Sequence, residues 1–140
     1  MTVYLDASCL VKLYVEEDGS DVVAALVEDA RVITTSAVAY AEVRAALARR
    51  RRERVLRPSA LSALVLQLDA DWDRIAAVGV TNPLARRAGV LAERHGLRGF
   101  DAIHLASFEL VLERAGDEDV HFSSADARLT QAARRLGGAL

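Results

Sequence analysis

Short apolar runs rich in β-branched residues alternate along this chain with longer segments whose apolar residues are spaced as in helices. This alternation limits the possible folds more than any other feature. Strands are predicted at residues 2–5, 32–35, 75–80 and 120–123. Helices are predicted at residues 9–15, 22–30, 37–47, 58–68, 82–95, 99–116 and 125–136. The order of these elements predicts an α/β fold whose central sheet is mostly parallel.

Composition narrows the class of protein. The 140 residues fit one domain, residues 1–140, and a content of 52% hydrophobic residues with two prolines excludes a disordered chain. The net charge of -2 neither favours nor excludes a nucleic-acid partner. Cys9 is the only cysteine, which excludes an internal disulfide and a cysteine-based zinc site. No apolar run reaches the roughly 18 residues that cross a bilayer, so we expect a cytoplasmic protein that does not enter a membrane.

Four acidic residues stand where predicted elements begin or end. Asp6 follows the first strand, Asp126 follows the fourth, Asp101 begins a helix, and Glu42 lies within one. The carboxyl ends of parallel strands meet at one edge of a sheet, so we expect these carboxylates to lie close together. Clustered carboxylates repel one another unless a cation compensates, and Mg²⁺ is the hard cation that oxygen ligands favour. The pattern predicts metal-dependent phosphodiester chemistry.

The segments around these acids resemble those of a known family. They are Val3-Tyr4-Leu5-Asp6-Ala7-Ser8, Glu42 with Arg44, the run from Leu97 to Ala106, and the run from Ser124 to Leu129. Together they resemble PIN domains, in particular the VapC toxins of bacterial type II toxin–antitoxin systems. The resemblance implies a three-layer α/β/α fold with four to five strands and an endoribonuclease dependent on Mg²⁺ or Mn²⁺. It also implies inhibition by a small cognate VapB-like antitoxin and a homodimeric assembly.

The resemblance also assigns roles to residues. Asp6, Glu42, Asp101 and Asp126 fall on the family's catalytic, metal-holding acidic quartet, with Asp6 and Asp101 as the first choices for direct ligands of one or two ions. The hydroxyls of Ser8 and Ser124 are expected to orient ligands or phosphate by hydrogen bonding. The alternative, purely structural roles are that Asp101 and Asp126 only cap helices and that Glu42 is a surface residue. A short last strand of the family is expected to be absent or vestigial at residues 137–140.

Several basic residues are candidates for contacts with RNA or antitoxin. Arg44 and Arg98 lie near the acids in sequence and could either pair with a carboxylate or receive a phosphate. The cluster from Arg49 to Arg54 could be a solvated helix end or a site of RNA or antitoxin contact. His104 follows Asp101 by three residues, but its apolar neighbours favour a role in core packing.

Three other functions compete with the nuclease. A receiver domain needs adjacent acids after the first strand and a lysine near the last one, whereas Lys12 is the only lysine. A haloacid-dehalogenase-like phosphatase needs an acid where Ser8 stands. A catalytically idle PIN fold that serves as a binding scaffold remains a third candidate.

Overall fold

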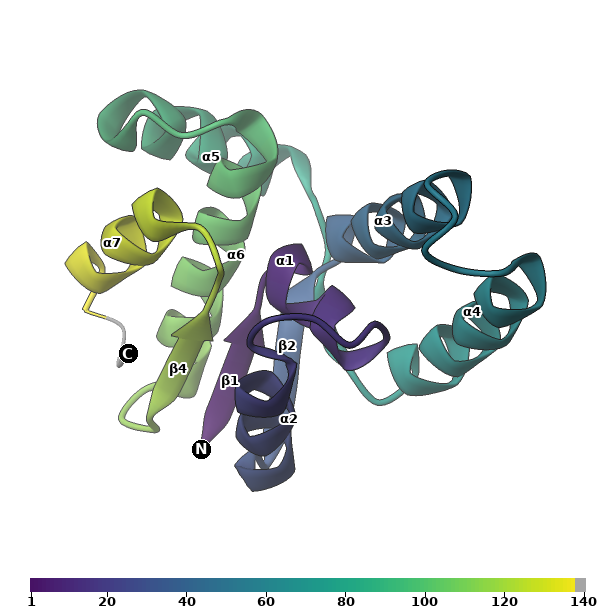
Figure 1. Cartoon of the computed structure of the whole chain (residues 1–140). Helices are drawn as coiled ribbons and strands as arrows, with labels where there is room; N and C mark the ends of the chain where they lie inside the picture. The colour runs from purple at the N-terminus through teal and green to yellow at the C-terminus, as the bar shows by residue number, and fades with distance from the viewer. Residues whose placement is uncertain (138–140) are drawn as a thin grey trace.

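The computed structural model describes residues 1–137, and four parallel strands form its sheet (Figure 1). The strands are β1 (Thr2–Leu5), β2 (Val32–Ser36), β3 (Ala76–Val78) and β4 (Val120–Ser123), in the order β3-β2-β1-β4. In the register, Thr2 pairs with Val32 on one side and Val120 on the other. The predicted parallel α/β sheet is therefore confirmed. The residues after Gly137, where a vestigial last strand was considered, lie outside the described range.

The helices cover both faces of the sheet and complete three layers (Figure 1). One face carries α5 (Asn82–His95), α6 (Gly99–Ala115) and α7 (Ala127–Arg135). The other carries α1 (Ala7–Leu10), the 3-10 helix η1 (Val11–Leu13), α2 (Ser20–Asp29), α3 (Val38–Arg52) and α4 (Pro58–Trp72). Alternate side chains of a strand point to opposite faces, so Tyr4 packs in the first core while Val3 and Leu5 pack in the second.

An aromatic cluster anchors β1, β4 and α6. The Tyr4 ring stacks on Phe122 with centroids 5.5 Å apart, and Phe108 lies 4.8 Å from Phe122. All three side chains are almost fully buried. Because α6 packs through Phe108 against the strand that precedes Asp6, the start of α6 is held at the carboxyl edge of the sheet.

Several helix boundaries differ from the predicted ones for local reasons. The helix predicted at residues 9–15 begins earlier, at Ala7, because Asp6 caps it, and it changes to a 3-10 helix at Val11. The helix α3 begins at Val38, whose backbone N–H donates to the Ser36 hydroxyl at 3.3 Å, while Ser36 itself stays in β2 and the N-cap position is Ala37. The strand predicted at 75–80 is shortened to Ala76–Val78 at the edge of the sheet.

Other boundaries follow their sequence signals. α5 spans the predicted residues 82–95, and the cap is Thr81, one residue before Asn82, which accepts a hydrogen bond from the Leu84 backbone N–H at 3.2 Å. The helix then stops at Gly96, whose φ of 64° is the left-handed conformation that glycine adopts without strain. Within residues 1–137, none of the helices combines the length and the apolar character needed to span a membrane.

Candidate functional site

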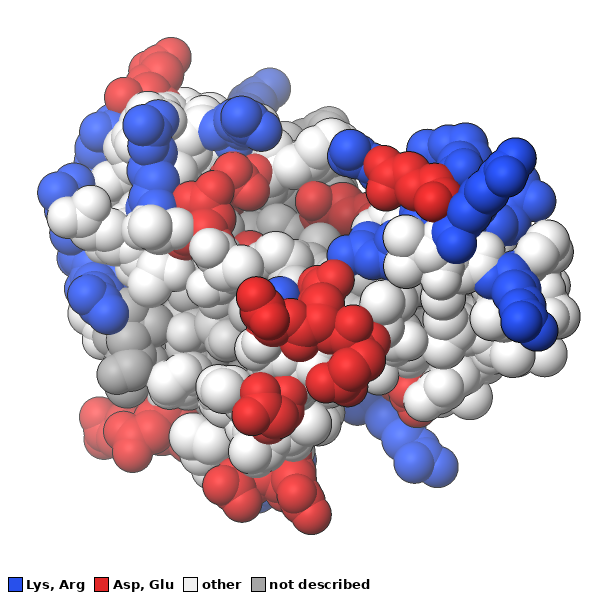
Figure 2. Space-filling model, in the orientation of Figure 1, with Lys and Arg blue, Asp and Glu red and all other residues white. Residues whose placement is uncertain are grey.

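The four acidic residues lie on elements that meet at the carboxyl edge of the sheet. Asp6 directly follows β1, Asp126 lies three residues after β4, Asp101 is in the first turn of α6, and Glu42 is in α3, which follows β2. Figure 2 shows acidic side chains around a recess between the α5–α7 side of the molecule and the α3–α4 side. The topology therefore directs these four sequence positions to one region.

Asp6 is the most buried of the four carboxylates, with 4% of its surface exposed. Its Oδ1 accepts hydrogen bonds from the Ser8 hydroxyl at 2.6 Å and the Cys9 backbone N–H at 3.1 Å. The Ser124 hydroxyl donates to its Oδ2. No basic side chain of the described residues forms an ion pair with Asp6, because the ammonium group of Lys12 instead pairs with Glu17 at 3.3 Å. A buried carboxylate held only by neutral donors can still accept a cation.

The two serines connect the ends of β1 and β4. The Ser8 oxygen accepts a hydrogen bond from the Ala125 backbone N–H at 2.9 Å, and the Ser124 oxygen accepts one from the Asp126 N–H at 3.0 Å. Asp126 caps α7 through a 2.9 Å hydrogen bond from the Leu129 N–H to its Oδ1. Asp126 therefore does cap a helix, and the residue is exposed.

The pKa of Asp101 reports that the four acids are close. Burial raises the pKa of this carboxyl above its ordinary value of 3.8, and the charges of Asp126, Asp6 and Glu42 raise it further, while His104 opposes the rise. The charges of Asp126, Asp6 and Glu42, which come from distant parts of the chain, therefore repel the ionised form of Asp101. Such repulsion is the electrostatic condition that a bound cation relieves.

Glu42 is held by a residue to which the sequence alone assigned only packing. The Nε2 atom of His104 lies 2.7 Å from Glu42 Oε1, and its Nδ1 atom lies 2.8 Å from the Tyr4 hydroxyl. His104 is 1% exposed and Tyr4 is fully buried. Core packing of His104 is confirmed, but its hydrogen bonds were missed. The available signal was the three-residue spacing from Asp101, which places both side chains on one face of α6.

A cavity of about 470 Å³ opens beside Glu42 and Asp101, and Arg98, Gly99 and Phe100 line the rest of it. Arg98 is exposed and forms no ion pair with another described residue. Arg44 does not pair with the acids either: it donates to the Tyr40 hydroxyl at 2.9 Å, and its guanidinium lies 5.7 Å from the Tyr40 ring centroid. The cavity thus joins two carboxylates, a free guanidinium and an exposed aromatic ring.

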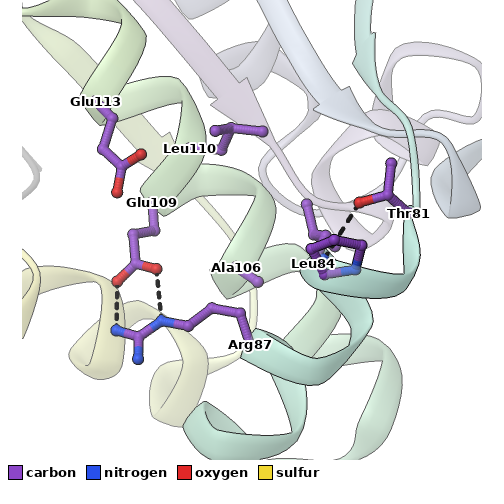
Figure 3. Close-up of a pocket in the computed structure, with 8 residues that line it drawn as sticks. Thr81, Leu84, Arg87, Ala106, Glu109, Leu110 and Glu113 are labelled. Atoms are coloured by element: carbon purple, nitrogen blue, oxygen red, sulfur yellow. Dashed lines mark hydrogen bonds and ion pairs between the residues drawn. The ribbon is translucent and has the colours of Figure 1, made fainter.

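A second hollow, of about 390 Å³, lies between α5 and α6 (Figure 3). Its main polar groups satisfy each other, because Arg87 donates two hydrogen bonds to Glu109 at 2.7 and 2.8 Å. This pairing lowers the pKa of Glu109, although burial opposes it. None of the acidic quartet lines this hollow. The chemistry therefore belongs to the recess at the carboxyl edge.

The acidic recess gathers the right donors without forming a coordination shell. Within the described part of the chain, no three His, Cys, Asp or Glu side chains converge closely enough to hold a metal ion. The donor set consists of carboxylate oxygens supported by hydroxyls, which fits the oxygen preference of Mg²⁺ and Mn²⁺. It does not fit a soft metal, because the one thiol, on Cys9, is buried and accepts a hydrogen bond from Ser123.

Comparisons with known proteins agree with this geometry. The family model described as PIN domain matches residues 3–135. Ribonuclease VapC45 and Ribonuclease VapC49, from two strains of Mycobacterium tuberculosis, are each 38% identical over 135 residues, which are 96% of this chain and 91% of the relative. Among solved structures, Mycobacterium tuberculosis VapC20, a toxin that cleaves the sarcin-ricin loop, superposes with a TM-score of 0.66. That match covers 93% of this chain and 94% of the other at 19% identity, and it supports the fold.

Proposed function

Because the chain belongs to the PIN-domain family and, within it, to the VapC ribonucleases, we propose that it is an endoribonuclease whose divalent cation is held by Asp6, Glu42, Asp101 and Asp126. Membership of the family confirms the resemblance of the four sequence motifs. It also removes the receiver and phosphatase alternatives. The match over residues 3–135 supports the proposal that the chain is a single PIN domain.

The observation that carries the proposed site is that Asp6, Glu42, Asp101 and Asp126 lie on elements that meet at one edge of the sheet, and it agrees with the raised pKa of Asp101. Burial comes first among its causes, followed by the charges of Asp126 and Asp6. A carboxyl in this environment favours the neutral form unless positive charge is added. A divalent cation, Mg²⁺ or Mn²⁺, would supply that charge when held by these carboxylates, together with the capacity to activate water and to neutralise phosphate charge.

The protein's own groups have separate roles in this proposal. Ser8 and Ser124 fix the two oxygens of Asp6, so this carboxylate cannot rotate away from the recess. Arg98 is exposed at the cavity beside Glu42 and Asp101, where its unpaired guanidinium can bind an RNA phosphate. Arg44 lies on the α3 surface with Tyr40 and can contact RNA or the antitoxin.

The partners in this proposal are RNA, a cognate VapB-like antitoxin and a second copy of the chain. A groove of about 480 Å³ between α3 and α4 is the proposed binding site for the antitoxin. Leu61 and Val65 line its apolar side, and Arg44 lines its charged side. Val90 on α5 is 45% exposed and offers apolar surface for a homodimer. Size-exclusion chromatography with light scattering, with and without the antitoxin from the neighbouring reading frame, tests both assemblies.

Cleavage by the purified, antitoxin-free protein tests the activity. Wild type is expected to cut RNA only with Mg²⁺ or Mn²⁺, and Asp6→Asn and Asp101→Asn are expected to abolish cutting while keeping the fold. Asp29→Asn, at the exposed end of α2, is the matched control and should cut normally. Sequencing of new RNA 5′ ends gives the cleavage site. Cation binding without cleavage of any RNA would instead favour the idle scaffold.

A further inference from the structure

We infer that His104 is a positioning residue that holds the Glu42 carboxylate ready for a divalent cation. This inference rests on the proposed function and adds a residue outside the acidic quartet. His104 lies in α6, and its two ring nitrogens contact Glu42 in α3 and Tyr4 in β1. One buried imidazole therefore links the three elements that frame the acidic recess.

The direction of the hydrogen bond to Glu42 follows from the chemistry of the two groups. A carboxylate only accepts hydrogen bonds, so the 2.7 Å contact requires a hydrogen on Nε2 of His104. The Tyr4 hydroxyl can donate to Nδ1 of a neutral imidazole, or accept from Nδ1 of a protonated one. Nε2 thus donates to Glu42 in either state. The tyrosine satisfies the far side of the ring and holds its orientation.

The contact fixes a side chain that has no other anchor. Within residues 1–137, His104 is the only hydrogen-bond partner found for the Glu42 side chain, which remains 29% exposed. A glutamate in that position would otherwise sample several rotamers in solvent. Oε1 is engaged, whereas Oε2 has no hydrogen-bond partner among residues 1–137, and Glu42 lines a cavity together with Asp101. The conformational freedom of Glu42 is therefore lost during folding and not during cation binding, which favours binding.

Packing alone does not explain a histidine at this position. The ring is 1% exposed and lies edge-on to Tyr4 with centroids 5.9 Å apart, a space that a leucine or phenylalanine would fill without buried polar atoms. Instead, both nitrogens are hydrogen-bonded, so the whole polar capacity of the ring is used. A buried and fully satisfied polar group that contacts a site carboxylate is how proteins orient metal ligands.

The test measures Mn²⁺ binding to the antitoxin-free protein by isothermal titration calorimetry. His104→Leu is expected to weaken binding by about 10- to 100-fold. His104→Gln retains an amide N–H near the Nε2 position and should recover most of the affinity. His121→Gln, which removes a half-buried imidazole from β4, is the matched control and should bind like wild type. Tyr4→Phe, which keeps the ring and removes the hydroxyl, should also weaken Mn²⁺ binding. It replaces His104→Leu in the measurement if that variant does not fold.

A double-mutant cycle separates positioning from a general structural effect. Glu42→Gln alone and Glu42→Gln combined with His104→Leu are expected to bind Mn²⁺ equally, because His104 acts through Glu42. Equal affinity of wild type, His104→Leu and Tyr4→Phe would overturn the inference, and so would additive losses in the cycle. If wild type binds no Mn²⁺, the proposed function itself fails and the inference falls with it, so the two failures are distinguishable.

Discussion

Ser124 and Asp6 lie 118 positions apart in the sequence, yet the Ser124 hydroxyl donates a hydrogen bond to Oδ2 of Asp6. The contact exists because β1 and β4 are parallel neighbours, paired from Thr2 with Val120 to Leu5 with Ser123. The residues that follow the two strands therefore emerge side by side. This relationship makes the loop after β4 part of the setting of the most buried carboxylate.

Removal of the Ser124 hydroxyl should impair the site more than the fold. Ser124→Ala leaves Oδ2 of Asp6 without its donor and the Asp126 N–H without its acceptor. We expect cleavage to fall by about 10-fold or more, while Ser124→Thr, which keeps the hydroxyl, stays near wild type. Ser62→Ala is the control, because Ser62 bonds only to a backbone carbonyl on the exposed surface of α4. Equal rates for Ser124→Ala and wild type would contradict the role of this serine.

Asp101 should make the stability of the metal-free protein depend on pH. Burial and the neighbouring carboxylates raise its folded-state pKa above 3.8. For a raised pKa, the stabilising contribution is complete below pH 3.8 and is lost as pH rises through the folded-state value. Asp101→Asn should therefore raise the melting temperature at pH 7 in EDTA and have little effect near pH 3.5.

The effect of divalent cations on the melting temperatures of wild type and Asp101→Asn is the complementary measurement. Mn²⁺ should raise the melting temperature of wild type at pH 7, because a ligand that binds only the folded state stabilises it. Asp101→Asn should show a much smaller rise. A lower melting temperature of the metal-free variant at pH 7 would show that the Asp101 charge is compensated within the protein.

The arginine cluster at the end of α3 divides into paired and unpaired members. Arg49 pairs with Glu53 at 2.9 Å and Arg50 pairs with Glu17 at 2.7 Å. The other members have no ion-pair partner among residues 1–137 and line a hollow of about 460 Å³ with Leu56 and Pro58; they are Arg51, Arg52, Arg54 and Arg57. Figure 2 shows basic side chains concentrated at this end of the molecule. Both interpretations of the cluster, a solvated helix end and an RNA contact, can now be separated.

Replacement of these four unpaired arginines by glutamine should weaken RNA binding and reduce its dependence on salt. Each lost phosphate contact lowers the slope of log affinity against log salt by about 0.7 for single-stranded RNA. Fluorescence anisotropy over a KCl series measures the slope. The matched control changes four exposed arginines of α5 and α7, namely Arg86, Arg94, Arg134 and Arg135. An unchanged slope in the first set would favour the solvated helix end.

Phe100 should contribute to RNA binding without contributing to stability. Its side chain is 60% exposed and lines the cavity beside Asp101. An exposed aromatic ring can stack on an RNA base, and each such contact is worth about 1–3 kcal/mol. Phe100→Ala should therefore raise KM for RNA cleavage, with a change in the free energy of unfolding within about 0.5 kcal/mol.

Phe108, two turns further along α6, should contribute to stability, in contrast to Phe100. It is fully buried between Tyr4 and Phe122, so Phe108→Ala should lower the free energy of unfolding by about 3–5 kcal/mol. Urea denaturation of both variants gives the comparison. A large loss of stability for Phe100→Ala would show that the ring packs in the fold instead of binding RNA.

The fold was predictable because its signals are local. The apolar run at Thr2–Leu5 is buried on both sides, and such runs mark strands between two layers of helices. α5 ends at His95 as predicted, because Gly96 after it adopts the left-handed conformation that favours glycine at a helix end. The boundary at Ser36 was hard to predict because this residue serves both elements: β2 extends through it to pair with Val78, and its hydroxyl accepts a hydrogen bond from the Val38 N–H of α3.

The site was predictable only in part. The positions of Asp6 and Asp126 after parallel strands indicated a common edge, because strand order brings them together. The contacts of Glu42 with His104 and of His104 with Tyr4 join residues 62 and 100 positions apart, and no periodicity in the sequence encodes such pairs. Asp69 and Asp71, in the last turns of α4, likewise accept hydrogen bonds from the distant Tyr40 and Tyr14. These contacts depend on tertiary packing.

The position of Cys9 supplies an internal reporter of how often the recess opens. Its thiol is buried, its backbone N–H bonds to Asp6, and it is the single cysteine of the chain. Burial raises its pKa, although the Ser123 hydroxyl opposes the rise, so the closed protein should react slowly with thiol reagents. The rate at which a thiol reagent modifies Cys9 in the folded protein can therefore measure transient opening of the β1–α1 junction without any engineered probe.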